Sequence, residues 1–191
     1  MDMVVVLYNI RSVHNVGSVF RTCDAAGGQK IFLVGITSTP LDRFGKYRVD
    51  FAKVALGAER VVQWEKRQVT SSLFKELKSQ GYEILAVEQD ERSVPYYSYK
   101  FKRDIIQGVR DKLDRDKGQE VGDKLSRDKR HVEKKVALIF GEETKGLPKS
   151  VLDKCDKILE IPMEGSKESL NVSVAAGIVI YGLIYKNEAL K

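Results

Sequence analysis

Residues 3–26 read MVVVLYNIRSVHNVGSVFRTCDAA and predict a buried strand followed by an amphipathic helix. The run over residues 3–8 is apolar and rich in β-branched side chains, which is typical of a strand covered on both faces of a sheet. Over residues 15–26 the apolar side chains recur at helical spacing, on one stripe that holds Val16, Val19, Phe20 and Cys23. Gly27 and Gly28 then end the helix. A strand followed directly by a helix is the repeating unit of a parallel α/β sheet.

The same alternation of strand and helix patterns continues along the chain. We expect further strands over residues 31–34, 82–87, 136–140 and 158–161, and further helices over residues 71–78, over residues 149–155 and from residue 169 onward. The fold class is therefore α/β, with a largely parallel sheet flanked by helices. With 191 residues, of which 42% are hydrophobic, the chain can form one globular core, so we expect a single domain over residues 1–191.

One segment, residues 102–135, interrupts this pattern. It carries 12 Lys or Arg and 8 Asp or Glu residues, and so +4 of the chain's formal net charge of +6. Within it, VRDKLDRDK (109–117) and VGDKLSRDK (121–129) are identical at seven of nine positions. Because so few apolar side chains cannot offset the entropy lost on ordering, we expect a charged insertion outside the core. It is either a solvated spacer or a binding element.

The sequence lacks the standard signatures of nucleotide-binding and hydrolytic enzymes. No GxGxxG follows the first strand and no GxxxxGK[ST] occurs, so neither a dinucleotide fold nor a P-loop is indicated. There is no GxSxG, and the chain has only two histidines, His14 and His131, which disfavours acid/base chemistry by histidine. Cys23 and Cys155 lie 132 positions apart without a CxxC pair, so we expect neither a disulfide framework nor a metal site.

The hydropathy pattern does not indicate a membrane protein. The longest nearly apolar stretch, residues 172–185, has 14 residues, whereas a transmembrane helix needs about 20. The N-terminus has no signal-peptide pattern. We therefore expect no membrane partner and a reducing, cytoplasmic environment.

Three polar clusters follow predicted strands, at residues 9–21, 141–148 and 162–173. In open α/β sheets, ligands bind at the carboxyl ends of the strands. The sequence therefore predicts that these three clusters form the functional site.

The three clusters resemble the motifs of a known family. Three segments are similar, in this order and spacing, to the motifs of the SpoU (TrmH-type) branch of the SPOUT RNA methyltransferases. They are NVGSVFRTCDAAG (15–27), IFGEETKGLP (139–148) and IPMEGSKESLNVSVAAGIVIY (161–181). The resemblance covers nearly the whole chain apart from residues 102–135. It implies an α/β domain with a C-terminal trefoil knot. It also implies a homodimer that binds S-adenosylmethionine, uses no metal, and methylates a ribose 2′-hydroxyl of tRNA or rRNA.

The resemblance further implies roles for individual residues. The catalytic positions are Asn15, Arg21, Glu143, Ser169 and Asn171. The positions that line the cofactor are Val87, Gly141, Ile161, Met163, Ser169 and Leu170. Arg21 matches the residue thought to activate the ribose hydroxyl. Because a guanidinium stays protonated, it would act by lowering the pKa of the hydroxyl and holding the RNA backbone. The chain departs from the family pattern at Glu142, where Asn or Gln is common, and this adds a negative charge near the site.

Most of these positions also have a purely structural interpretation. Arg21 lies opposite the apolar stripe, where a solvated arginine is ordinary. Asn15 and Ser169 could cap the first and the last helix. Glu143 could be favoured by the dipole of the helix that follows it. Asn171, in the first turn of the predicted last helix, is harder to explain structurally.

The last helix is apolar almost all round over residues 172–185. A helix without a polar face must be covered on both sides. The sheet can cover one side, and we expect a second copy of the chain to cover the other, in agreement with the dimer that the resemblance implies.

Two functions of different classes follow. The first is an S-adenosylmethionine-dependent RNA 2′-O-methyltransferase, and the second is a non-catalytic RNA-binding or ribosome-associated protein on the same fold. The joint presence of Arg21, Glu143, Ser169 and Asn171 favours the enzyme.

Overall fold

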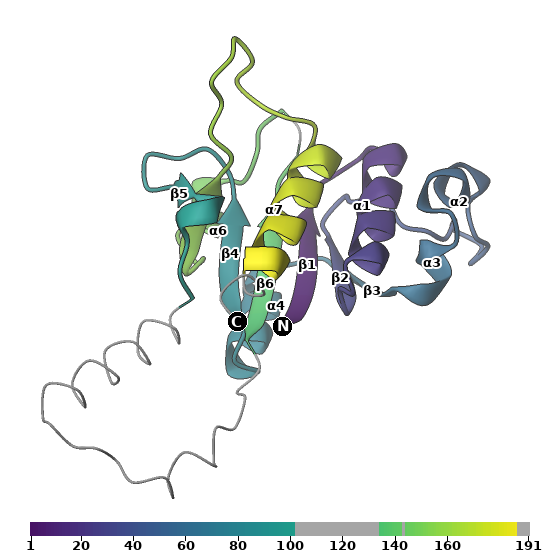
Figure 1. Ribbon diagram of the computed structural model, residues 1–191. Coiled ribbons are helices and arrows are strands. Elements are labelled where there is room, and N and C mark those ends of the chain that lie inside the picture. Colours follow the sequence, from purple (N-terminus) through teal and green to yellow (C-terminus); the bar gives the residue numbers. More distant parts are fainter. Residues whose placement is uncertain (102–133, 143, 187–191) are drawn as a thin grey trace, which may run out of the picture.

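The computed structural model describes residues 1–101, 134–142 and 144–186, and these residues form a seven-stranded sheet between two layers of helices (Figure 1). The strand order is β3-β2-β1-β6-β4-β7-β5, and each described pair of neighbours is parallel. The strands are β1 (Asp2–Tyr8), β2 (Lys30–Val34), β3 (Gln63–Arg67), β4 (Glu83–Val87), β5 (Val94–Pro95), β6 (Lys135–Phe140) and β7 (Lys157–Glu160). The predicted α/β class with a parallel sheet is confirmed.

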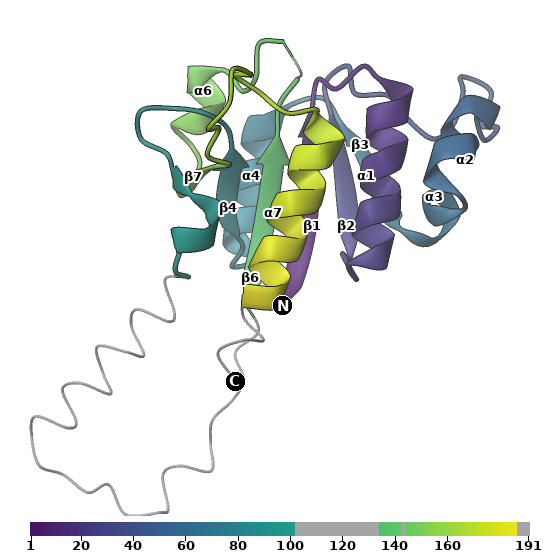
Figure 2. The ribbon, with the colours of Figure 1, turned by 45° about the horizontal axis from the view of Figure 1, so that its top comes forward.

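Helices cover both faces of the sheet. One face carries α1 (Val13–Ala25), α2 (Val49–Ala55), α3 (Ala58–Val61) and α7 (Val172–Lys186). The other face carries α4 (Thr70–Ser79) and α6 (Lys149–Leu152). A 3₁₀ turn, η1 (Tyr96–Ser98), follows β5. In both Figure 1 and Figure 2, α7 and α1 lie side by side over the middle of the sheet.

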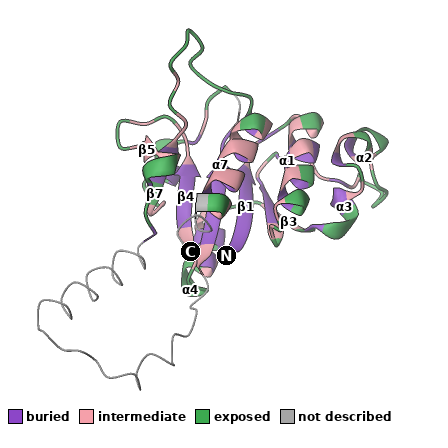
Figure 3. Cartoon of the chain, viewed as in Figure 1, coloured by how far each residue is buried: buried purple, intermediate pink, exposed green. Residues whose placement is uncertain are grey.

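Side chains along β1 alternate between two hydrophobic cores. Met3, Val5 and Leu7 pack on the side of α1 and α7, whereas Val4 and Val6 pack on the side of α4 and α6. The strands β4 and β6 alternate in the same way, and Figure 3 shows the central strands buried. A strand that is covered on both faces needs no polar positions. This explains the continuous apolar run that begins the chain.

The carboxyl ends of three central strands are level. Leu7 of β1 and Val87 of β4 both pair with Phe140 of β6. The segments after β1, β4 and β6 therefore leave the same edge of the sheet at the same height, as the sequence analysis assumed.

Among the described elements, five were missing from the prediction: α2, α3, β3, β5 and η1. β3 reads QWEKR and is an edge strand, where charged side chains discourage pairing with other chains, so it has no apolar run. α2 has only seven residues and depends on packing against α1. The Phe51 ring meets Phe20 edge-on at 5.2 Å between centroids, and Gly17 allows the close approach because a Cβ there would lie 3.2 Å from the Cβ of Val54. Such packing cannot be read from a short local pattern.

Some predicted boundaries were wrong. The helix expected over residues 149–155 ends at Leu152. The last helix begins at Val172 rather than at residue 169. The predicted insertion falls on residues 102–133, which lie outside the described residues, but Lys135 opens β6 and so belongs to the sheet.

The path of the C-terminal segment carries the chain from β7 back across the sheet to α7. The trefoil knot and the single-domain organisation stay predictions. Within the described ranges, none of the helices combines the length and apolar character that crossing a bilayer requires.

Candidate active site

A pocket of about 400 Å³ opens at the carboxyl ends of β4, β6 and β7. This volume is within the range of roughly 300–1,000 Å³ that is typical of small-molecule sites. The segment after β7 extends beyond the strand ends (Figure 1). Residues of this segment line one side of the pocket. All six positions that the resemblance assigned to the cofactor line this pocket: Val87, Gly141, Ile161, Met163, Ser169 and Leu170. The structure thus brings together residues up to 83 positions apart in the sequence.

The segment after β6 folds back tightly to form one wall of the pocket. The backbone N–H of Gly146 donates to the carbonyl of Glu142 at 3.0 Å, and the same two residues form an isolated antiparallel bridge. A Cβ on Gly141 would lie 2.5 Å from the carbonyl carbon of Gly146, so only glycine fits there. Gly146 has φ +61°, a conformation that favours glycine.

Glu88, which the sequence analysis missed, fastens this wall to β4. Its Oε2 accepts a hydrogen bond from the backbone N–H of Leu147 at 2.8 Å, and its Oε1 accepts from the backbone N–H of Gln89 at 3.1 Å. A Cβ on Gly146 would lie 2.2 Å from Glu88 Oε2. Glu88 directly follows the predicted strand at residues 82–87, so the rule that found the other clusters could have found it.

Asn171 joins the first and third motifs. Its Nδ2 donates to Asn15 Oδ1 at 3.0 Å, which links the start of α7 to the first turn of α1. Its Oδ1 accepts from the backbone N–H of Ser173 at 2.8 Å and from Ser173 Oγ at 2.7 Å, and its carbonyl accepts from the N–H of Ala175 at 2.9 Å. Asn171 is therefore the N-cap of α7 as well as a bridge between two helices.

These bonds correct two structural interpretations. Asn15 does not cap α1, because Ser12 does: its Oγ accepts from the backbone N–H of Asn15 at 3.2 Å. Ser169 does not cap the last helix, which begins three residues later, and instead lines the pocket. Asn171, the position that was harder to explain structurally, turns out to have a capping role.

The structure does not bring every predicted residue to the pocket. Arg21 is exposed on α1, and no ion pair joins its side chain to a carboxylate of the described residues. It lies six residues beyond Asn15, about 9 Å farther along the helix axis. Neither of these two residues lines the pocket. Glu143 lies outside the described residues.

The pocket is acidic. Four of the residues that line it carry a carboxylate, and one carries an ammonium group. The four are Glu88, Glu142, Glu160 and Glu168, and the lysine is Lys145. Such a lining favours a ligand that carries positive charge and disfavours a phosphate. Glu142, the departure from the family pattern, contributes to this balance.

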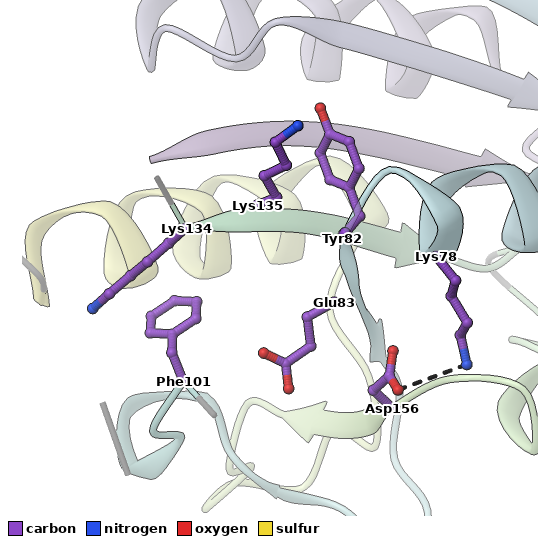
Figure 4. A pocket seen from close by; sticks show the side chains of 8 residues that line it. Lys78, Tyr82, Glu83, Phe101, Lys134, Lys135 and Asp156 are labelled. Carbon is purple, nitrogen blue, oxygen red and sulfur yellow. Dashed lines mark ion pairs between the residues drawn. The ribbon is translucent and has the colours of Figure 1, made fainter. Parts of the chain in front are cut away.

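A second cavity, of about 290 Å³, lies at the opposite edge of the sheet, where β4 and β6 begin (Figure 4). Its lysines already have neighbours. Lys78 Nζ lies 3.6 Å from a carboxylate oxygen of Asp156, and two more lysines lie over aromatic rings, Lys134 over Phe101 and Lys135 over Tyr82. None of the predicted site residues lines this cavity.

In the described part of the chain, no three His, Cys, Asp or Glu side chains come together in a way that could hold a metal ion.

Comparison with known proteins gives a consistent result. A family model described as the SpoU rRNA Methylase family matches residues 2–181. A 23S rRNA (guanosine-2′-O-)-methyltransferase, RlmB, of Ralstonia nicotianae is 28% identical over 94% of this chain and 57% of its own length. A tRNA (guanosine(18)-2′-O)-methyltransferase of Aquifex aeolicus is 25% identical over 94% of this chain and 67% of its own length.

Solved structures share the fold. The TrmH/SpoU tRNA modifying enzyme of A. aeolicus has a TM-score of 0.72 at 24% identity, over 99% of this chain and 77% of that one. An AdoMet-bound rRNA methyltransferase of Sinorhizobium meliloti also has a TM-score of 0.72, at 23% identity, over 100% of this chain and 57% of that one. The chain thus spans less than two thirds of the length of several proteins that it matches.

Proposed function

The chain belongs to the SpoU rRNA Methylase family, and on that premise we propose that it transfers a methyl group from S-adenosylmethionine to a ribose 2′-hydroxyl of tRNA or rRNA. One observation carries the proposal. Six residues from three separate parts of the sequence line a single pocket at the carboxyl edge of the sheet. The third motif, which supplies four of them, is also hydrogen-bonded to the first through Asn171 and Asn15.

The residues present fit this cofactor. S-adenosylmethionine carries a sulfonium, an ammonium and a carboxylate group, which leaves it a net positive charge, and the carboxylates of the pocket supply the opposite charge. The apolar side chains of Val87, Ile161, Met163 and Leu170 would hold its apolar parts. When bound, the cofactor supplies an electrophilic methyl group. The backbone at Gly141 and Gly146 would fix its orientation, because glycine leaves no side chain in the way.

Arg21 would act on the RNA rather than on the cofactor. Its side chain is exposed, as a group that contacts RNA must be. It would hold a phosphate by paired hydrogen bonds and stabilise negative charge on the 2′-oxygen as the proton leaves. The main task of the protein is then alignment of the hydroxyl with the methyl group.

A homodimer is the second part of the proposal. Val174, Ile178, Tyr181 and Tyr185 recur at helical spacing on α7, and Val174 and Tyr185 are 49% and 56% exposed. Tyr181 and Tyr185 stack at 5.8 Å between centroids. In this apolar stripe (Val174, Ile178, Tyr181 and Tyr185) the two end residues are exposed and the two middle ones are half-buried, and a second copy would cover the exposed part. We also propose that the enzyme acts in the cytoplasm, where tRNA and ribosomes are present.

Isothermal titration calorimetry with S-adenosylmethionine tests the assignment of the pocket. We expect binding by the wild-type protein and its loss in Gly141→Val, whose side chain would fill the turn. Gly165→Val is a matched control, because a Cβ at Gly165 would meet nothing within 4 Å. A protein that binds RNA but shows no heat with the cofactor would instead be the non-catalytic RNA-binding protein.

A further inference from the structure

A cluster of aromatic and basic side chains lies outside the candidate active site and belongs to none of the three motifs. We call Arg43, Phe44, Lys46, Tyr47 and Arg60 the aromatic–basic surface. Phe44 is 71% exposed and Tyr47 is 41% exposed. Large aromatic side chains usually bury most of their area, so two exposed rings beside three cations need an explanation.

The exposed rings are held on a rigid hairpin. Asp42 Oδ1 accepts from the backbone N–H groups of Phe44 at 2.8 Å and Lys46 at 2.9 Å. The Asp42 N–H in turn donates to the Lys46 carbonyl at 2.8 Å, and Leu41 and Tyr47 form an antiparallel bridge. Gly45 takes φ +77° at the turn. A preorganised loop loses little conformational entropy on binding, so it presents Phe44 ready for a ligand.

Each exposed ring has a guanidinium over it. The Cζ of Arg43 lies 4.7 Å from the centroid of Phe44, and the Cζ of Arg60 lies 4.5 Å from the centroid of Tyr47. These cation–π contacts gather positive charge at the rings. A flat ring with a cation beside it matches both parts of an unpaired nucleotide, the base and the phosphate.

The acidic groups nearby are already occupied. The carboxylate of Asp42 accepts backbone hydrogen bonds of the hairpin. Asp50 pairs with Arg48 at 2.8 Å, which holds the pKa of the Asp50 carboxyl below its usual value. Glu59 is buried, with 3% exposure, and its Oε1 lies 3.6 Å from Nε of Arg60, so it balances part of the charge of that cation from below the surface. The solvent-facing side of the surface therefore presents cations and rings, which suits a polyanion better than an apolar protein partner.

The surface is firmly attached to the edge of the sheet that carries the first motif. Between β2 and the hairpin, Ser38 Oγ donates to the carbonyl of Arg11 at 2.6 Å, and Thr37 Oγ1 accepts from the N–H of Ile10 at 3.1 Å. In Figure 1 and Figure 2, α2 and α3 lie beside α1 on the side away from α7. An RNA strand that passes Arg21 on α1 can thus continue onto this neighbouring part of the molecule.

We propose that the aromatic–basic surface binds unpaired nucleotides of the RNA, with bases stacked on Phe44 and Tyr47 and phosphates next to Arg43, Lys46 and Arg60. The proposal rests on the proposed function, because it makes this surface a second contact for the same RNA. Stacking of a base on an aromatic side chain tolerates any base, so the surface would recognise single-stranded RNA rather than a particular sequence.

Fluorescence anisotropy with a labelled oligouridylate tests the proposal, alongside a labelled blunt RNA duplex of equal length. Phe44→Ala should weaken binding of the single strand on the order of 10-fold, the scale of one lost stack, and leave the duplex unchanged. Phe44→Leu keeps the apolar bulk without the ring and should behave like Phe44→Ala. Phe44→Trp keeps an aromatic ring and should bind the single strand with an affinity close to that of the wild type. Arg43→Ala should lower the salt dependence by about one counterion.

Val49→Ala is the matched control, because Val49 is 72% exposed on the neighbouring α2 and has no ring. It should bind the oligouridylate like the wild type. Equal affinity of Phe44→Ala and wild type for the single strand would overturn the proposal. So would a Phe44→Leu variant with wild-type affinity, since apolar contact alone would then suffice. Should Phe44→Ala alter only the mass measured by light scattering, the surface is an interface between copies and the proposal fails.

Failure of the proposed function would look different. If the wild type transfers no methyl group but Phe44→Ala still lowers the affinity for single-stranded RNA, the surface is assigned correctly and the enzyme assignment is wrong. If methyl transfer and cofactor binding are intact but Phe44 variants bind RNA normally, only the surface assignment is wrong.

Discussion

Arg21 is the residue on which the proposed chemistry depends most, although it does not line the pocket. Arg21→Ala should leave cofactor affinity nearly unchanged and lower the methylation rate by roughly two or more orders of magnitude, the scale of one lost electrostatic contact in a transition state. Single-turnover methylation with calorimetry in parallel separates the two effects. Methylation near the wild-type rate would remove Arg21 from the mechanism.

Glu88 lines the pocket and also holds the pocket wall in place through the N–H of Leu147. Glu88→Ala should weaken cofactor binding on the order of 10-fold, the value of one hydrogen bond to a charged acceptor. Glu88→Gln keeps an oxygen acceptor and should recover part of the affinity. The constants come from calorimetry, with thermal unfolding as a check on stability. If both variants bind like the wild type, the loop after β6 does not need this bond.

At the scale of elements, Asn171 combines a helix cap with a link between α1 and α7. Asn171→Ala loses both and should reduce the free energy of unfolding by about 1–2 kcal/mol. Asn171→Ser keeps a capping oxygen but is too short to reach Asn15, and Asn15→Ala loses only the link. Chemical denaturation should therefore rank Asn171→Ala as the least stable of the three. Equal stability of Asn171→Ala and Asn171→Ser would show that the cap contributes nothing.

The elements that could be predicted from the sequence are those whose own pattern is strong. β1 and β6 are buried on both faces and are continuous apolar runs, and α1 has a regular stripe. β3 could not be predicted, because an edge strand carries charges, and α2 is too short to show a period without its contact to α1.

The candidate site, like the fold, could be predicted only where a local sequence pattern marks it. Polar clusters after strands indicated its position, and the resemblance supplied the cofactor positions that the structure brings together. The role of Asn171 as a cap depends on where α7 begins, and the helix was expected to begin three residues too early, at residue 169 rather than at Val172. The aromatic–basic surface depends on Arg60 of α3 lying over Tyr47 of the hairpin, a contact between two segments that no local pattern contains.

At the scale of the whole molecule, the exposed apolar stripe of α7 predicts a dimer. Val174→Arg should produce monomers, measured by light scattering, because it places a charge on the stripe without entering the core. Ile180 is unsuitable for this test, since it is fully buried within one copy. Val69→Arg is the matched control, as Val69 is 54% exposed at the start of α4 on the other face. A wild-type protein that is already monomeric at micromolar concentration would contradict the dimer.

The central claim is that this protein methylates the ribose 2′-oxygen of RNA. The most direct measurement incubates the purified protein with unmodified tRNA and rRNA and S-adenosylmethionine, digests the RNA to nucleosides, and identifies the methylated product by mass spectrometry. We expect a 2′-O-methylnucleoside with the wild-type protein and its near absence with Arg21→Ala. A methyl group on a base, or no methylated nucleoside from either RNA although the cofactor binds, would contradict it.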